Sequence, residues 1–310
     1  MSSNLNNVIV EDNPTIDNKF RIIKRLGHGS FSIVYLVENL ENNERIALKA
    51  LNQKEVFPVS VGDFENEKNM LLSVNHENII KLLDPNIFEG VVTQAQKVQK
   101  VIYILTEFCE LGDITNYIKK GFPAKIARFF FRQLISAVEA IHNMNIAHRD
   151  IKSPNIVIDK NLKLKLVDFG LASEMKNSLG ENILFNSVKG TKYCMAPEIF
   201  SGSPFLADKN DIFACGVVLF NFLTGKFPFQ IATDYDPMYR ILSRKEYIKF
   251  WKMNKYSSLA EDAKLLIEGM LCKNPNERLS LEDIKKSDFF NGEIEDIEEI
   301  NNFIKNTLLI

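Results

Sequence analysis

The chain has 310 residues, 45% of them hydrophobic and 25% charged, and its 38 basic and 40 acidic side chains leave a formal net charge of −2. A chain of this length and composition can bury a core, which excludes a collagen-like fibre, a disulfide-stapled small fold and a mostly disordered chain. No dense block of lysine and arginine occurs, so we expect no nucleic-acid partner.

Cysteine usage and the chain's apolar stretches bear on its compartment. The four cysteines form no CxxC pair, which argues against a disulfide framework or a zinc site and favours a reducing compartment. Residues 1–13 resemble neither a secretion signal nor a myristoylation site. The most apolar stretch, residues 212–223, is too short to cross about 30 Å of hydrocarbon. We therefore expect a cytoplasmic location, with the nucleus left open, and no membrane partner.

The first part of the chain has the pattern of strands. Short apolar and β-branched runs predict strands over residues 20–26, 33–38, 45–51, 79–83 and 101–106. Apolar positions every three or four residues predict a helix over 64–74. The stretch 86–100 is more polar than a hairpin needs and is expected to be a surface insertion.

Beyond Gly112 the pattern changes to helix. One apolar stripe runs over residues 127–141, and further helices are expected at 207–223, 259–270 and 281–286. A β-rich part followed by a helical part predicts two lobes of one α+β domain, with a hinge near residues 107–112. Isoleucines at helical spacing predict an amphipathic helix in the tail, residues 291–310, which either binds a partner or regulatory surface or packs on the large lobe.

A glycine-rich turn lies between the first two expected strands. Gly27, Gly29 and Ser32 give the pattern G-x-G-x-x-S. Glycines let a backbone approach phosphate groups closely, and the following strand excludes a dinucleotide-binding fold, which needs a helix there. A plain β-turn explains the glycine pair equally well.

A lysine occupies the middle of the third expected strand. Lys49 has apolar neighbours on both sides, so an inward orientation would require an anionic partner, either a carboxylate such as Glu67 or a phosphate. The alternative is an edge-strand lysine whose amine reaches water.

Two loops farther along carry a concentrated set of polar groups. One holds Asp150, Lys152 and Asn155, and the other begins at Asp168. Their oxygen atoms suit a hard cation such as Mg²⁺, which bridges protein carboxylates to substrate phosphates. A solvated turn explains any one of these residues but not the set.

Taken in order, these motifs resemble those of eukaryotic protein kinases of the serine/threonine type. The matching set is the glycine loop, Ala47-Leu48-Lys49, Glu67, His148-Arg149-Asp150 with Asn155, Asp168-Phe169-Gly170, Ala196-Pro197-Glu198, Asp211 with Gly216, and Arg278. The resemblance covers residues 18–290 and implies the bilobal kinase fold, with a small lobe over 18–108 and a large lobe over 109–290. Residues 1–17 would then be a disordered extension. Asp211-Ile212-Phe213 and Phe250-Trp251 are similar to the calcium/calmodulin-dependent-like group.

The resemblance implies phosphoryl transfer from ATP, with Mg²⁺, to a protein substrate. Lys49 would hold the α- and β-phosphates and pair with Glu67. Asp168 and Asn155 would bind Mg²⁺, Asp150 would orient the attacking hydroxyl, and Lys152 would neutralise the transferred group. The implied ATP site consists of Leu26, Gly27, His28, Gly29, Ser30, Val34, Ala47, Lys49, Glu67, Thr106, Glu107, Cys109 and Asp113.

Other matched positions are expected to be structural. By resemblance, Glu198 and Arg278 form an ion pair, Asp211 receives amides of the catalytic loop, and His148 is a packed histidine. Three departures stand out, namely Ser32 for a loop glycine, Phe213 for tryptophan, and the neutral Pro154 and Asn221 where strongly arginine-directed kinases carry acids. A strict demand for several arginines is therefore not expected.

Acceptor type and regulation follow from the same resemblance. Lys152 together with Thr191 indicates serine/threonine specificity. Ser187 is a candidate for phosphorylation by an upstream kinase or by autophosphorylation, with Arg149 as partner of the phosphate. The alternative is an exposed loop serine.

Two other functions compete with an active protein kinase involved in signalling. A pseudokinase scaffold would have lost Lys49, Asp150, Asn155 or Asp168, and all four are present. Phosphoryl transfer to a small molecule is disfavoured because such enzymes usually lack the long activation segment, here residues 168–198.

Overall fold

The structure, a computed structural model, describes residues 14–28, 32–52, 58–94, 97–253 and 256–308. The chain divides into two compact units. Unit 1 comprises Met1–Lys68 and Lys81–Phe108, and unit 2 comprises Asn69–Ile80 and Cys109–Ile310. Unit 1 is rich in strands and unit 2 in helices, which confirms the expected α+β class.

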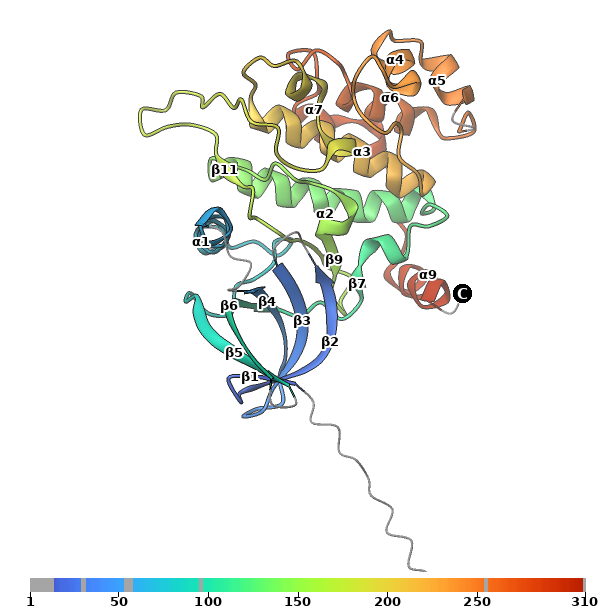
Figure 1. Cartoon of the computed structure of the whole chain (residues 1–310). Helices are drawn as coiled ribbons and strands as arrows, with labels where there is room; N and C mark the ends of the chain where they lie inside the picture. Colours follow the sequence, from blue (N-terminus) through green and yellow to red (C-terminus); the bar gives the residue numbers. More distant parts are fainter. Residues whose placement is uncertain (1–13, 29–31, 53–57, 95–96, 254–255, 309–310) are drawn as a thin grey trace, which may run out of the picture. The chain divides into compact units, whose positions relative to one another are not determined.

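Unit 1 is built on one antiparallel sheet that closes on itself (Figure 1). The strand order is β1-β2-β3-β4-β6-β5, and β1 closes the sheet because it pairs with both β2 and β5. The strands are β1 Thr15–Ile16, β2 Phe20–His28, β3 Ser32–Asn39, β4 Arg45–Asn52, β5 Phe88–Gln94 and β6 Lys97–Glu107. Helix α1 spans Pro58–Ser73, and its residues from Asn69 onward group with unit 2.

Alternation along β4 decides which side chains enter the core of unit 1. Ile46, Leu48 and Ala50 join the main cluster inside the sheet. Since successive side chains of a strand point to opposite faces, Lys49 shares the other face with Leu51. Leu51 packs there with Phe64 of α1. The strand therefore directs Lys49 to the side of the sheet that α1 covers.

Three expectations for unit 1 were wrong. Residues 86–100 are not an insertion, because β5 and β6 pair there as a hairpin. Residues 79–83 form isolated bridges at Ile79 and Leu82 in place of a strand. The extension expected over residues 1–17 is too long, because Thr15–Ile16 belong to the sheet.

Unit 2 is organised around two long helices that run side by side in Figure 1, α2 at Ala124–Asn143 and α3 at Ala207–Thr224. Helix α2 buries one face, whereas α3 is buried almost all round and forms the centre of the unit. The other helices are α4 Pro237–Ser243, α5 Tyr247–Met253, α6 Glu261–Met270, α7 Leu281–Lys286, α8 Asp288–Asn291 and α9 Ile297–Leu308.

Unit 2 also contains short strands and 3₁₀ turns, which lie between its loops. The strands are β7 Gly112–Asp113, β8 Ile146–Ala147, β9 Ile156–Ile158, β10 Leu164–Leu166 and β11 Ser173–Glu174, and the turns are η2 Ile114–Asn116, η3 Ser153–Asn155, η4 Lys192–Cys194 and η5 Pro197–Phe200. Strand β9 pairs with both β10 and β7. Of the helices in the described part of the chain, none is both long enough and apolar enough to cross a bilayer.

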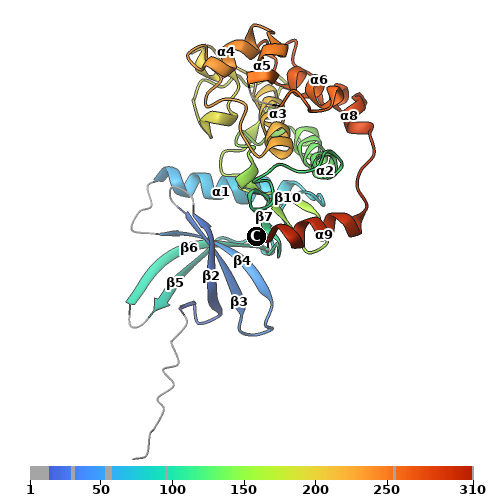
Figure 2. The same ribbon diagram turned by 90° about the vertical axis from the view of Figure 1, so that its right-hand side faces the viewer.

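The tail helix α9 packs against unit 2. Figure 2 shows the segment that connects α8 to α9. Arg132 of α2 fixes this segment by donating to the carbonyl oxygens of Phe290 and Gly292, each at 2.6 Å. The ring of Phe303 then meets Phe122 edge-on, with centroids 5.7 Å apart. Of the two roles considered for the tail, the packed one is therefore observed.

We predict that Ile304→Ala lowers the free energy of unfolding by about 2–5 kcal/mol, because it removes a side chain that is only 2% exposed. The matched control is Ile297→Ala at a position that is 52% exposed, where a change below about 0.5 kcal/mol is expected. Urea denaturation of both variants measures the difference. Equal effects would mean that α9 does not pack as described.

Candidate active site

The predicted partner of Lys49 is Glu67. Lys49 Nζ lies 2.5 Å from Glu67 Oε2, and the two side chains are only 15% and 5% exposed. Strand β4 lies between β3 and β6 and is not an edge strand, so the water-reaching alternative is wrong. The pair holds an ammonium group at a fixed place on the face of the sheet that α1 covers.

Strand register brings the other candidate residues of unit 1 toward Lys49. Gly27 is opposite Val34, and Val34 is opposite Lys49, so the three form a row across β2, β3 and β4. Two residues along β4, on the same face as Lys49, Ala47 is opposite Thr106, whose hydroxyl donates to the Ala47 carbonyl at 3.4 Å.

Of the remaining candidates for the ATP site, some belong to unit 1, some belong to unit 2, and some lie outside the described residues. In unit 1, Leu26 is 40% exposed, and a carboxylate oxygen of Glu107 accepts from the Lys81 amide at 2.9 Å. In unit 2, Cys109 is buried and Asp113 accepts from the Thr115 amide, while burial raises the pKa of the Asp113 carboxyl. Gly29, Ser30 and the side chain of His28 lie outside the described residues.

A buried carboxylate of α3 holds the loop that carries Asp150. Asp211 is fully buried and accepts from the backbone amides of His148 and Arg149, both at 2.8 Å, as the resemblance implied. Arg149 has a φ of 68°, a conformation that costs energy for a residue with a Cβ. The two hydrogen bonds to Asp211 compensate for this cost. They also fix the backbone immediately before Asp150, and so help to orient its side chain.

His148 is a structural group of this loop. Its Nδ1 accepts from the Asp150 amide at 3.3 Å, so its Nε2 carries the hydrogen that it donates to the Val167 carbonyl at 3.1 Å. The ring is fully buried and packs edge-on against Phe169. Both ring nitrogens are therefore committed, which confirms the expectation of a packed histidine.

The two carboxylate oxygens of Asp150 have different surroundings. Oδ2 accepts from Lys152 Nζ at 2.6 Å and from Asn155 Nδ2 at 3.2 Å. Oδ1 is buried and has no hydrogen-bond partner among the described residues. A buried acceptor without a partner costs free energy, which a donor from a bound molecule would recover. Lys152 Nζ also donates to the Thr191 hydroxyl at 2.8 Å, which ties the carboxylate to the activation segment.

The candidate metal ligands, Asn155 and Asp168, lie at the same end of the β9–β10 hairpin. Asn155 precedes β9 and Asp168 follows β10, and the Val167 amide donates to the Asn155 carbonyl at 3.0 Å. The amide nitrogen of Asn155 is used by Asp150, which leaves its amide oxygen for a cation. Asp168 has a φ of 67°, so both candidate loops contain a residue in the left-handed region.

This donor set suits Mg²⁺. A carboxylate and a carboxamide oxygen are hard ligands, and Mg²⁺ keeps several water molecules and needs few protein ligands. Within the described ranges there is no cluster of three or more histidine, cysteine and acidic side chains of the kind that encloses a metal by protein alone.

Arg149 connects the catalytic loop to Ser187. Its Nη2 lies 3.4 Å from Ser187 Oγ, and its guanidinium lies over the Phe185 ring at 4.3 Å. Burial lowers the pKa of Arg149, and no described carboxylate approaches its guanidinium within 4.0 Å. The positively charged Arg149 therefore lies beside the Ser187 hydroxyl and has no ion-pair partner among the described residues.

The expected ion pair between Glu198 and Arg278 is present and bidentate. The two nitrogen–oxygen distances are 2.6 and 2.8 Å, and Arg278 also donates to the Cys272 carbonyl at 3.1 Å. The guanidinium lies over the ring of Phe213, 5.1 Å from its centroid, so phenylalanine provides an aromatic face at this position.

Sequence reasoning missed two groups that support the site. His142, in the last turn of α2, lies 3.0 Å from Asp211 Oδ2. Asn210 accepts from the Ala196 amide at 3.0 Å and so fixes the end of the activation segment. The position of Asn210 next to Asp211, a residue of a recognised motif, could have marked it as a supporting residue. No pattern in the sequence marks His142.

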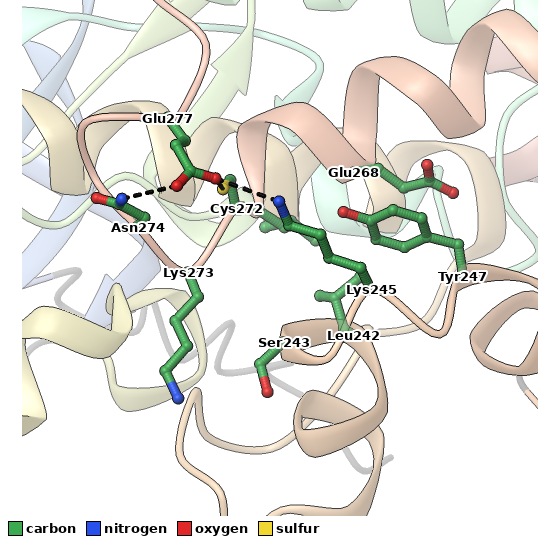
Figure 3. Close-up of a pocket in the computed structure, with 10 residues that line it drawn as sticks. Leu242, Ser243, Lys245, Tyr247, Glu268, Cys272, Lys273, Asn274 and Glu277 are labelled. Atoms are coloured by element: carbon green, nitrogen blue, oxygen red, sulfur yellow. Dashed lines mark hydrogen bonds and ion pairs between the residues drawn. The ribbon is translucent and has the colours of Figure 1, made fainter.

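A cavity of about 380 Å³ lies elsewhere in unit 2, near α4, α5 and the end of α6 (Figure 3). The ion pair of Lys245 and Glu277, 3.2 Å apart, is at its centre. None of the residues that line it belongs to the predicted site.

Comparison with known proteins identifies the family. Residues 20–290 match the Protein kinase domain, and the chain belongs to this family, whose members generally use ATP and Mg²⁺. It is 32% identical over 274 residues to CBL-interacting serine/threonine-protein kinase 12 of Arabidopsis thaliana, covering 88% of this chain and 52% of the relative. CBL-interacting protein kinase 26 of Oryza sativa subsp. japonica is 32% identical over 275 residues, again 88% of this chain and 52% of the relative.

The chain spans about half the length of these relatives. They represent a plant group related to the calcium/calmodulin-dependent kinases, which agrees with the group resemblance drawn from the sequence.

We predict that Arg278→Ala lowers the free energy of unfolding by about 3–5 kcal/mol, because it leaves the Glu198 carboxylate without its partner in a largely buried place. Arg244→Ala, at an exposed position after α4, is the matched control and is expected to change stability by less than about 0.5 kcal/mol. Chemical denaturation measures both. A loss at Arg278 no larger than at Arg244 would contradict the assigned role.

Proposed function

We propose that this chain is a serine/threonine protein kinase that transfers the γ-phosphoryl group of ATP to a hydroxyl group of a protein substrate. The observation that carries the proposal is the asymmetry of the Asp150 carboxylate, with Oδ2 held by Lys152 and Asn155 and Oδ1 buried without a described partner. A carboxylate arranged in this way is ready to accept the hydrogen of one incoming hydroxyl group.

In the proposed reaction the acceptor oxygen forms a bond to the γ-phosphorus while the bond from that phosphorus to the β–γ bridging oxygen breaks. The hydroxyl hydrogen passes to Asp150 Oδ1, and ADP leaves. Lys152 keeps the carboxylate in place through Oδ2 and contributes positive charge. Phosphoryl transfer depends mainly on positioning and charge neutralisation, which these groups supply.

The phosphates require positive charge as well. Lys49, fixed by Glu67, would contact the α- and β-phosphates. Asn155 and Asp168 would hold Mg²⁺, which supplies further neutralisation of the phosphate oxygens when bound. No observation favours the pseudokinase alternative, since Lys49, Asp150 and Asn155 all keep the contacts that catalysis would use.

The comparisons and the cysteines support narrower proposals. The relatives are named serine/threonine and CBL-interacting kinases, which supports a serine or threonine acceptor and a protein partner in addition to the substrate. None of the four cysteines forms a disulfide, in keeping with a reducing compartment, and we place the activity in the cytoplasm, with the nucleus left open.

The direct test is transfer of labelled γ-phosphoryl from ATP with Mg²⁺ to a degenerate serine/threonine peptide pool. We expect Asp150→Asn and Asp168→Ala each to lower the rate by a factor on the order of 10² to 10⁴, because a proton acceptor or a metal ligand is lost. Asp288→Asn, at an exposed position of α8, is the control and should retain full activity.

Phosphoamino-acid analysis of the products is expected to give phosphoserine and phosphothreonine. Phosphotyrosine as the main product would reject the acceptor type. Absence of transfer by the unmodified chain, with Ser187 phosphorylated, would favour the scaffold function.

Phosphorylation of Ser187 is proposed as an activating switch, because the guanidinium of Arg149 is already next to the hydroxyl. We expect Ser187→Ala to lower activity on an added peptide about tenfold, the equivalent of one charge-assisted hydrogen bond. Ser178→Ala in the same segment, also exposed, is the control. Full activity of Ser187→Ala would remove the switch from the proposal, and mass spectrometry of the active chain identifies the modified serine.

A further inference from the structure

Exposed lysines from three separate segments of unit 2 lie near the activation segment. They are Lys119 and Lys120 before α2, Lys192 in η4, and Lys226 after α3. No described carboxylate lies within 4.0 Å of any of their amines. Other lysines of this unit do pair with described acids, for example Lys285 with Glu139 at 2.8 Å.

Backbone packing brings the first and third of these segments together. Gly225 ends α3 with a φ of 68°, and a Cβ at this position would lie only 2.6 Å from the Lys119 carbonyl oxygen. The Phe122 amide donates to the Phe222 carbonyl at 2.6 Å in the same contact. Because Gly225 contacts the backbone of Lys119, the next residue, Lys226, lies close to Lys119 in space.

An aromatic pair joins the second segment to the third. The rings of Tyr193 and Phe227 are 4.3 Å apart, and Phe227 is 38% exposed. Each ring directly follows a lysine, Lys192 in one case and Lys226 in the other. We call Lys119, Lys120, Lys192 and Lys226, together with this ring pair, the lysine surface.

The lysine surface is continuous with the proposed acceptor site. Lys152 contacts both Asp150 and the Thr191 hydroxyl, and Thr191 immediately precedes Lys192. A substrate whose hydroxyl group reaches Asp150 would thus pass close to these lysines.

The acids in this region do not neutralise the lysine surface. Burial raises the pKa of Tyr193 to about 12, and the charges of Cys194, Asp150 and Asp113 add to this shift, so two of the nearby groups are carboxylates. Asp150 is already paired with Lys152. Asp113 is used in capping η2, where it accepts from the Thr115 amide. Neither carboxylate pairs with any of the four lysines, so their positive charge is available to a bound molecule.

We propose that the lysine surface binds acidic side chains of the protein substrate that lie within a few residues of the phosphoacceptor. This inference rests on the proposed kinase function and specifies its substrate class. Charge complementarity carries it, because exposed ammonium groups without acidic partners attract carboxylates through water at low salt. The neutral Asn221, buried and bonded to Ser153, provides no charge there that would favour arginine.

The test compares peptides with one serine acceptor flanked by glutamate, by alanine or by arginine. We expect the glutamate-flanked peptide to have a kcat/KM about tenfold above the alanine-flanked one at low salt, and the ratio to fall as salt screens the charges. The combined variant Lys119→Ala/Lys120→Ala/Lys226→Ala should bring this ratio close to one, mainly through KM. The matched control, Lys100→Ala/Lys285→Ala/Lys286→Ala, removes the same charge from exposed positions on β6 and α7 and should keep the ratio.

A binding measurement separates this inference from the kinase function itself. A fluorescent glutamate-flanked peptide with alanine in place of serine is expected to bind the unmodified chain more tightly than the lysine variant, as measured by anisotropy. Preference for the arginine-flanked peptide, or equal binding by both proteins, would overturn the inference while kinase activity stands. Charge-dependent binding without phosphate transfer to any peptide would instead reject the proposed function and keep the surface.

Discussion

The Asp211 carboxylate, buried in the central helix of unit 2, accepts from two consecutive amides of the loop that carries Asp150. Those bonds make it possible for Arg149 to adopt a left-handed backbone conformation. In this conformation the guanidinium of Arg149 lies 3.4 Å from the Ser187 hydroxyl, and the next residue is Asp150. Since α3 is buried on nearly every side, the carboxylate has a rigid base. The acceptor site and the proposed switch therefore both depend on Asp211, which contacts neither Asp150 nor Ser187 but holds the backbone between them.

Polar groups around the acceptor site are satisfied with one exception, and that exception is informative. His148 has both ring nitrogens bonded, and Lys152 is shared between Asp150 and Thr191. Buried acceptors rarely remain without a donor in folded proteins. That Asp150 Oδ1 has none among the described residues is what the proposed acceptor role requires, because a substrate hydroxyl would supply the missing donor. The side chains of the site thus hold one another in place. The free-energy cost of an unsatisfied acceptor falls on Asp150 Oδ1, the atom proposed to accept the hydroxyl hydrogen.

Much of this arrangement could be predicted from sequence, because its signals are local. Periodicity located α2 and α3, and the rule that an inward lysine needs an anion led to Glu67. The β5–β6 hairpin was missed because its many polar residues resemble a loop, and β1 was missed because two residues carry no periodicity. Contacts from a side chain to a distant backbone, such as Arg132 to the Phe290 carbonyl, leave no pattern in sequence at all.

Asn221 links the architecture of α3 to the charge of the lysine surface. Its Oδ1 accepts from the Ser153 hydroxyl at 2.6 Å, and its Nδ2 donates to the Lys226 carbonyl at 3.2 Å. Only a carboxamide can do both, since a carboxylate has no hydrogen to donate and would repel the carbonyl. The same residue therefore bonds to the backbone of Lys226 and adds no negative charge of its own beside the lysine surface. The hydrogen bonds at the end of α3 thus require a neutral side chain, and a neutral side chain there is compatible with the proposed binding of acidic substrates.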